Sequence, residues 1–317
     1  MAIKRRSVWL DYQAAGEDAA LVRNISAIVW ADPYLWTASD EGRTVECLEP
    51  HRGGFRLLRQ FGLDEIFDHL PGKKDGDEID LESLDFRDGE LWLCGSHCIV
   101  RKQARKSKAT MVDPELRERK SRRLLGRVAV DSLLNERPRS YAVPLTGRKS
   151  LRERLAGDPF IRPFVGLPSK ENGLDIEGLA IGKNRLFIGL RGPVVDSIAL
   201  VAELSLTGVN KVSARPPILH FLDLHGLGVR DLTVRGETIF VLAGPVTAAL
   251  GPFRLYQWSR RMTKRIQRPR RVYGWPNGSV APEGICFKDG ELLVVYDVGN
   301  DDRRIRGARC RADIFKV

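Results

Sequence analysis

Hydrophobic and polar positions follow the same pattern in five segments, which align without gaps. The segments are residues 25–40, 81–96, 176–191, 229–244 and 282–297. In the first half of each segment, large apolar side chains alternate with small ones, which is typical of a β-strand. The second half is apolar on both faces, which indicates a strand covered on each side by another layer. Each segment therefore predicts a β-hairpin.

Turn signals lie at the centre of these hairpins. Asp88-Gly89 and Asp289-Gly290 are short turns, in which glycine supplies the positive φ that such turns need. The second residue of each segment, at positions 26, 82, 177, 230 and 283, recurs at intervals of 53 to 56 residues, apart from one interval of 95. About 53 residues suit four short strands and their turns.

The repeat predicts an all-β fold, a β-propeller. Direct counting gives five blades, and six is the alternative if residues 124–174 contain a degenerate blade. A strand near Val8–Tyr12 is expected to pair with the last blade and close the ring. We expect one domain over residues 1–317, with a basic insertion near 101–124 and a polar loop segment near 146–174. Within that segment, Ser150–Leu155 predicts a short helix.

Charged residues recur at the start and the end of the hairpins. Because the second strand returns antiparallel to the first, these positions share one face and are expected to ring one mouth of the central channel. The charged and polar residues at or beside these positions are Asp40, Glu82, Ser96, His97, Glu177, Arg191, Arg230, Asp231, Glu283 and Asp297. Carboxylates that converge repel one another unless a cation or a basic side chain lies between them.

Three roles follow for this ring of residues. Ca²⁺ or another divalent cation is expected to bind the carboxylates, since both Ca²⁺ and Mg²⁺ prefer oxygen ligands. These carboxylates are Asp40, Glu82, Glu177, Glu283 and Asp297. Glu177, Arg191 and Arg230 are the catalytic candidates for hydrolysis of a phosphate ester or ester. Asp231, Ser96 and His97 are candidate contacts to a small anionic ligand.

A structural role for the same ring is the alternative. Arg191 and Arg230 are able to neutralise the carboxylates, which would leave a closed ring without a ligand. The chain is then a non-enzymatic scaffold that docks an anionic partner or a protein through its basic loops. The residues alone leave both hypotheses open.

The net charge of +11 is concentrated in two segments. Residues 101–124 contain ten Lys/Arg and three Asp/Glu, and residues 259–271 contain seven Lys/Arg and no acid. We expect both segments to follow the third strand of their blades, on the face opposite the acidic mouth, and to bind polyanions weakly without sequence preference. His220 and His225 are expected on an outer strand and loop, with an ordinary surface role.

Targeting signals and cysteine usage indicate the cellular compartment in which the chain is expected. No stretch reaches the ~18 apolar residues of a membrane helix, and the N-terminus lacks the apolar region of a signal peptide. An odd count of five cysteines does not form a disulfide framework, and Cys94 to Cys98 lacks zinc-site spacing. We therefore expect a cytoplasmic protein without a membrane partner, with Cys94 and Cys286 buried in strands.

Two short motifs resemble a known family. The run Asp175-Ile176-Glu177-Gly178-Leu179-Ala180, followed by Gly189-Leu190-Arg191-Gly192-Pro193, resembles an uncharacterised bacterial domain family of unknown function over most of the chain. Pro282-Glu283-Gly284-Ile285 resembles the second half of that signature. The Glu-Gly-hydrophobic strand start is similar, more distantly, to esterase-like phytase and gluconolactonase-type propellers. That resemblance implies a glutamate that binds a divalent cation.

Overall fold

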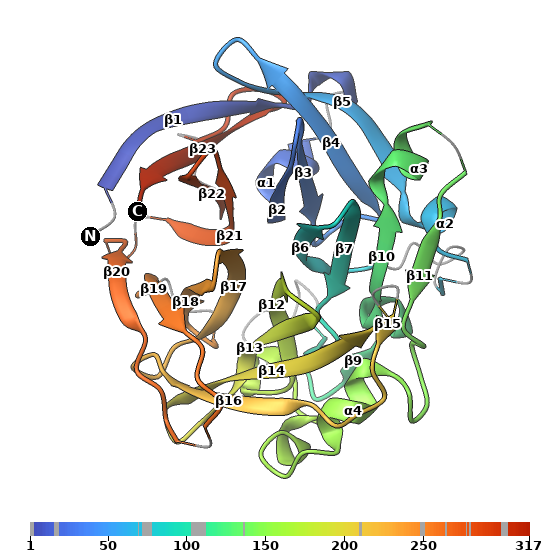
Figure 1. Cartoon of the computed structure of the whole chain (residues 1–317), viewed down its shortest axis with the longest axis vertical. Helices are drawn as coiled ribbons and strands as arrows, with labels where there is room; N and C mark the ends of the chain where they lie inside the picture. Colours follow the sequence, from blue (N-terminus) through green and yellow to red (C-terminus); the bar gives the residue numbers. More distant parts are fainter. Residues whose placement is uncertain are drawn as a thin grey trace.

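Five blades of antiparallel strands surround a central axis, and the first strand of each blade lies innermost (Figure 1). This computed structural model describes every residue except 1–2, 16–18, 69, 72–77, 103–111, 136, 209–210, 248–250, 264, 277, 279 and 299–303. The arrangement is a β-propeller of five blades, as the repeat predicts.

Blades 1 and 2 come from the first half of the chain. Blade 1 consists of β2 (Ile25–Ala31), β3 (Tyr34–Ser39), β4 (Thr44–His51) and β5 (Gly54–Gly62). Blade 2 consists of β6 (Leu81–Arg87), β7 (Glu90–Gly95), β10 (Leu125–Ala129) and β11 (Ser140–Ala142). Their first two strands are the hairpins predicted over residues 25–40 and 81–96.

Blades 3, 4 and 5 repeat this order. Blade 3 contains β12 (Asp175–Gly182), β13 (Arg185–Val195), β14 (Ile198–Thr207) and β16 (Ile218–Asp223), with β15 (Lys211–Val212) beside β14. Blade 4 contains β17 (Gly228–Arg235), β18 (Thr238–Gly244), β19 (Arg254–Ser259) and β20 (Arg270–Gly274). Blade 5 contains β21 (Ala281–Lys288), β22 (Glu291–Asp297), β23 (Arg309–Lys316) and β1 (Ile3–Asp11).

The N-terminal strand completes the last blade, as predicted. β1 pairs antiparallel with β23 from Ile3 opposite Lys316 to Asp11 opposite Arg309. It also makes a short parallel pairing with β5, with Leu10 opposite Phe55, so that blades 5 and 1 join at their outer edges. β1 thus covers the edge of β23 along its length, and two of its residues also pair with β5.

The segment between β10 and β12 does not contain a sixth blade. Besides β11 it forms α3 (Val130–Asn135), α4 (Leu151–Ala156) and two short 3-10 helices, at Arg162–Phe164 and Ser169–Glu171. The hydroxyl of Ser150 accepts a hydrogen bond from the Glu153 amide and caps α4, which confirms the predicted helix. The remaining helices are short as well, at Gln13–Ala15, Ala19–Arg23, Leu63–Ile66 and Lys120–Arg123.

Packing between neighbouring blades supplies the hydrophobic core. The blades bury one another's faces, and their largest fully buried side chains include Trp36, Trp92 and Trp258. Burying side chains of this size contributes roughly 2–3 kcal/mol each. Cys94 and Cys286 are buried strand residues, as expected, and all five cysteines are free. No helix in the described part of the chain has the length and apolarity needed to cross a membrane.

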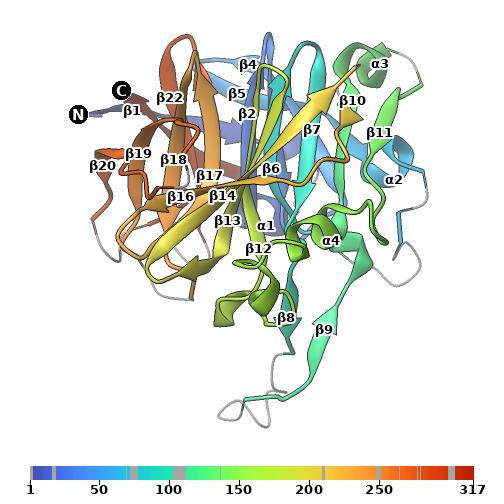
Figure 2. The same cartoon turned by 60° about the horizontal axis from the view of Figure 1, so that its bottom comes forward.

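The two basic segments lie on opposite faces, which corrects the sequence-based expectation for one of them. The 101–124 insertion follows the second strand of blade 2 rather than the third, and its strands β8 (Ile99–Arg101) and β9 (Leu116–Glu118) project from the body of the propeller (Figure 2). Its residues 103–111 lie outside the described part. The other segment follows the third strand of blade 4, as expected.

Candidate functional site

A β-bulge interrupts the innermost strand of every blade at the same place. Between the paired residues on either side, one residue of the inner strand has no partner on the second strand. These unpaired residues are Ser26, Glu82, Glu177, Arg230 and Glu283. A bulge breaks the alternation of side chains and redirects the extra residue. The charged ring predicted from the repeat is therefore built by five equivalent bulges.

Glycine after the bulged glutamate allows close packing of the next blade in two cases. A Cβ at Gly178 would lie 2.9 Å from the Leu232 side chain, and a Cβ at Gly284 would lie 3.2 Å from the Ile28 backbone nitrogen. These distances leave no room for a larger residue. The Glu-Gly pairs of blades 3 and 5 thus combine a redirected carboxylate with a tight contact between blades.

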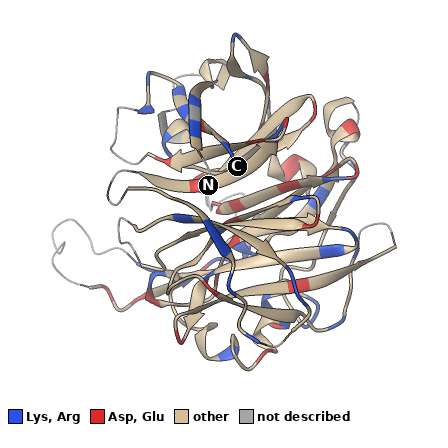
Figure 3. Cartoon of the chain, turned by 60° about the vertical axis from the view of Figure 1, so that its left-hand side comes forward, with Lys and Arg blue, Asp and Glu red and all other residues tan. Residues whose placement is uncertain are grey.

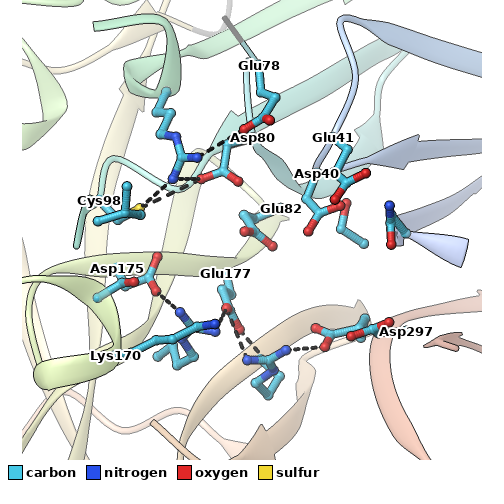
Figure 4. Close-up of a pocket in the computed structure, with 18 of the residues that line it drawn as sticks. Asp40, Glu41, Glu78, Asp80, Glu82, Cys98, Lys170, Asp175, Glu177 and Asp297 are labelled. Carbon is cyan, nitrogen blue, oxygen red and sulfur yellow. Dashed lines mark hydrogen bonds and ion pairs between the residues drawn. The ribbon is translucent and has the colours of Figure 1, made fainter. Parts of the chain in front are cut away.

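The bulged residues open into a cavity of about 400 Å³ at one mouth of the channel (Figure 4). Nine carboxylates and four cationic side chains line it among the residues that the structure describes. They are Asp40, Glu41, Glu78, Asp80, Glu82, Asp175, Glu177, Glu283 and Asp297, with Arg122, Lys170, Arg191 and Arg230. All five carboxylates and both arginines predicted for the mouth are among them. The wall is strongly acidic, in contrast to the net positive charge of the chain.

Arg191 and Arg230 bind the deepest carboxylates. Arg191 pairs with Asp175 and lies 2.7 Å from Glu177, while Arg230 lies 3.0 Å from Glu177 and pairs with Glu283. None of these five side chains is more than 13% exposed. Burial raises the pKa of Glu177 to about 7, while the two neighbouring guanidinium groups oppose that shift. The five groups form one network that joins blades 3, 4 and 5.

A second arginine cluster comes from the 101–124 insertion. Arg122 contacts Asp80 at 3.0 Å and Glu78 at 3.1 Å, and it donates a hydrogen bond to the Cys98 sulfur at 3.2 Å. Burial raises the pKa of the Cys98 thiol, so this thiol is not an activated nucleophile. The insertion therefore supplies one wall of the cavity.

Glu82 and Asp40, which are half-buried, differ from the paired carboxylates. Neither side chain forms a hydrogen bond or an ion pair with any residue that the structure describes, and Figure 4 shows Glu82 without a dashed line. Burial and the neighbouring Asp80 carboxylate raise the pKa of Asp40 to about 8. Burial, Asp80 and Glu177 raise the pKa of Glu82 well above its usual range. These two groups carry uncompensated negative charge when they ionise.

The three residues predicted to contact a ligand do not line the cavity. Ser96 is buried and donates a hydrogen bond to Asp80, which lines the cavity. His97 is 1% exposed, and burial lowers the pKa of its imidazole to about 3, so the ring is neutral. Asp231 is 2% exposed and accepts hydrogen bonds from the Ser83 hydroxyl at 3.0 Å and the Ile285 amide at 2.7 Å.

Asp231 belongs to a set of polar side chains that connect neighbouring inner strands. Ser26 donates to the Leu81 carbonyl, and the Ser83 hydroxyl accepts from the Leu179 amide at 2.8 Å. Because its partners are backbone groups and a buried hydroxyl, Asp231 holds blades 2, 4 and 5 together deep in the channel. The same carboxyl has a pKa raised well above its usual range, chiefly by burial.

Several lining residues fall outside the positions that the repeat identifies. Glu41, Glu78, Asp80 and Lys170 belong to the loops or short helices around the mouth. In the sequence, Asp175 is distinguished only as the first residue of the Asp-Ile-Glu-Gly motif. In the structure, Asp175 of β12 pairs with Gly192 of β13. A second bulge at Arg191 lies next to this pair.

The described carboxylates of the cavity are too dispersed to hold a metal ion together. Among the residues described, no three His, Cys, Asp or Glu side chains are grouped closely enough to hold a metal ion together. The carboxylates beside Glu82 are instead distributed around the cavity wall or engaged by arginine. The described residues therefore do not by themselves form a resident metal site of the kind implied by the distant propeller resemblance.

Solved structures of similar shape are distant in sequence. The chain is similar to glutaminyl cyclase from Myxococcus xanthus, at 10% identity and a TM-score of 0.47, covering 100% of this chain and 97% of that one. It is also similar to the PQQ-bound aldose sugar dehydrogenase from Streptomyces coelicolor, at 11% identity and a TM-score of 0.44, covering 100% and 98%. Likenesses at this level carry no argument about activity.

The family assignment comes from the sequence instead. No protein of curated function matches the chain. The family described as Protein of unknown function (DUF3616) matches residues 24–313, from just before β2 to within β23. This range contains all five inner hairpins and every residue of the acidic cavity. The chain therefore belongs to the family of proteins of unknown function DUF3616.

Proposed function

We propose that this propeller binds a small organic cation, an amine or a guanidine, at its acidic mouth. The proposal rests on the unpaired Glu82 carboxylate beside Asp40. The described lining of this cavity contains nine carboxylates and four cationic side chains. Three of those four cations already have carboxylate partners. A ligand cation is the group that would satisfy the remaining negative charge.

An anionic ligand at this mouth is disfavoured. Arg191 and Arg230 are the residues expected to hold it, yet both guanidinium groups are bound by Asp175, Glu177 and Glu283. An anion would have to displace one of these carboxylates and leave it buried without a partner, at a cost of roughly 3–5 kcal/mol. The small anionic ligand predicted from the sequence is therefore the weaker candidate.

The size of the cavity favours an organic molecule over a bare ion. A volume of about 400 Å³ is within the range of sites for small organic ligands. A divalent cation remains a competing ligand, because Glu82 and Asp40 offer oxygen atoms, but a third grouped donor is absent from the described residues. Binding is also favoured over hydrolysis, since Glu177, Arg191 and Arg230 neutralise one another.

A thermal-shift experiment with matched ligand panels tests this proposal. The purified chain is melted at pH 8 and low salt with putrescine, spermidine and agmatine, with Ca²⁺, Mg²⁺, Mn²⁺ and Zn²⁺, and with phosphate and citrate. The proposal predicts that an organic cation raises the melting temperature, because it binds only the folded ring. Glu291→Gln, on the opposite end of blade 5, is the control and keeps the response.

Each other outcome has a defined meaning. A response to divalent ions alone would replace the organic cation by a metal. A response to neither kind of cation would overturn the proposal and favour the scaffold alternative, in which the ring is structural.

A further inference from the structure

A second cavity of about 620 Å³ lies at the other end of the inner strands. Its lining includes the turn between β12 and β13 and the turn between β17 and β18, together with Arg87 at the end of β6. Because these turns lie at the far end of the strands from the bulges, the cavity opens on the face opposite the acidic mouth. This second cavity is separate from the acidic mouth and takes no part in the function proposed for that mouth.

The charge of this cavity is opposite to that of the mouth. In its described lining there are five cationic side chains and one carboxylate, that of Glu237. The cations are Arg87, Lys183, Arg185, Arg215 and Arg260. Along the strands, Lys and Arg positions are interspersed with acidic ones (Figure 3). The excess of cationic over acidic side chains in this cavity is therefore a local feature.

A buried carboxylate fixes two of these arginines. Glu203 has a side chain that is 1% exposed, and it pairs with Arg185 and, at 3.0 Å, with Arg260. Although burial opposes ionisation, the hydrogen bond from His220 and the nearby Arg260 hold the pKa of Glu203 below its usual range. One ionised carboxylate between two guanidinium groups positions both and leaves an excess of positive charge.

His220 completes this support from inside blade 3. Its Nε2 lies 2.7 Å from Glu203, and its side chain is fully buried, which corrects the surface role expected from the sequence. Gln267 lies 3.4 Å from the other ring nitrogen and accepts a hydrogen bond from Trp258 at 2.9 Å. Arg185 and Arg260 are therefore held by a connected buried network rather than by exposed contacts alone.

The two remaining cations of blade 3 are open to a ligand. Lys183 and Arg215 are exposed, and neither side chain forms an ion pair with a residue in the described ranges. Phe187, Val234 and Ile239 supply apolar surface beside them. Phe187 is 4% exposed and is the cavity's aromatic residue, so a platform for stacking successive bases is missing from the described lining.

We propose that this cavity binds a small organic anion, one that carries phosphate or carboxylate groups on a partly apolar body. Guanidinium and ammonium groups donate charge-assisted hydrogen bonds to both kinds of oxyanion. The apolar residues of the wall are suited to the remainder of such a molecule. A long polyanion is disfavoured because the described lining lacks a series of aromatic side chains along which successive bases could stack.

Calorimetric titration at low salt tests the proposal with three small probes, pyrophosphate, glycerol 3-phosphate and citrate, and with heparin as the polyanion. At least one small probe is expected to bind, and the preference among them separates phosphate from carboxylate. Replacing Lys183→Ala and Arg215→Ala together is expected to weaken binding at least about tenfold, the loss that follows from one or two charge-assisted hydrogen bonds.

A double variant with the same charge change is the control. Arg56 and Arg268 have side chains 53% and 85% exposed and do not line the cavity, so Arg56→Ala with Arg268→Ala should leave binding unchanged. The proposal is overturned if no small probe binds the wild-type chain, if both double variants weaken binding equally, or if heparin alone binds. Glu82→Gln, at the other mouth, should not alter anion binding, which keeps this result separate from the proposal for the acidic site.

Discussion

Glu82 and Glu177 occupy equivalent bulges in neighbouring blades, but only Glu177 has cationic partners. Glu177 lies 2.7 Å from Arg191 and 3.0 Å from Arg230, whereas the Glu82 side chain has no hydrogen bond or ion pair with any described residue. Equivalent positions in the repeat therefore perform different tasks. The paired glutamate connects blades, and the unpaired one is available to a ligand.

Glu82→Gln should stabilise the chain in the absence of ligand. Burial and the surrounding carboxylates disfavour ionisation of Glu82, so a neutral isostere removes that cost. We expect the free energy of unfolding to increase by about 1 kcal/mol, the scale of relieving one poorly compensated polar group. Urea unfolding at pH 8 measures this change, and a less stable variant would contradict the assignment of Glu82 as an unpaired group.

Glu177→Gln should have the opposite effect. The substitution removes the carboxylate that lies between two buried guanidinium groups, and a loss of about 3 kcal/mol is expected for breaking such a network. The same urea experiment measures it, with Glu82→Gln as the matched change at the equivalent bulge. Equal stability of the two variants would show that pairing does not distinguish these positions.

Cation binding should strengthen as the pH rises toward about 8. The pKa of Asp40 is raised to about 8, so protons compete with a bound cation below that pH and cease to compete above it. The unliganded chain should show the reverse trend. Between about pH 4 and pH 8 the folded state holds a proton that the unfolded state has released, so stability falls as the pH rises through that range.

Affinity and stability measured at pH 6, 7, 8 and 9 test both trends. Affinity that is constant over this range, or that falls with pH, would contradict a site containing Asp40.

Asp231→Ala should destabilise the chain without altering cation binding. Its carboxyl group accepts from Ser83 and from the amides of Leu232 and Ile285, which would lose their partner. A decrease of about 2–3 kcal/mol in the free energy of unfolding is expected for unsatisfied buried donors. Denaturant unfolding and a ligand titration are measured on the same variant. Loss of cation binding in a variant that remains folded would show instead that Asp231 takes part in ligand binding.

Removal of residues 1–11 should lower the melting temperature by roughly 10 °C. The deletion removes the fourth strand of blade 5, including the buried side chains of Val8 and Leu10. It also exposes the edge of β23. A melting curve like that of the full chain would show that the β1–β23 pairing contributes little to closure.

The sequence predicts the blades well because two-sided burial imposes a repeated pattern on the inner strands. The hairpin containing Asp88-Gly89 and the one containing Asp289-Gly290 have the same register and the same turn. The convergence of Glu82, Glu177 and Glu283 also follows, since equivalent strand positions must meet around one axis. The bulges themselves are not visible in the alternation, because one extra residue changes the face of only a single side chain.

Pairing among the charged groups depends on contacts between blades and could not be predicted. Asp175 binds Arg191 across a strand pair, while Arg122 reaches Asp80 from an insertion that the repeat does not contain. Ser96 and His97 follow the end of β7, and His97 has a positive φ; neither side chain lines the cavity, although Cys98 directly after them does. Local pattern gives the position of such residues along a strand and leaves their direction in the loop undetermined.

Calorimetric titration of the wild-type chain and of Glu82→Gln at pH 8.5 tests the central claim most directly. The ligand is the organic cation that gives the largest thermal shift. The account predicts binding to the wild-type chain with a stoichiometry near one, and no measurable binding to Glu82→Gln, which folds but lacks the open carboxylate. Equal affinities for the two proteins, or absence of binding by the wild-type chain, would contradict it.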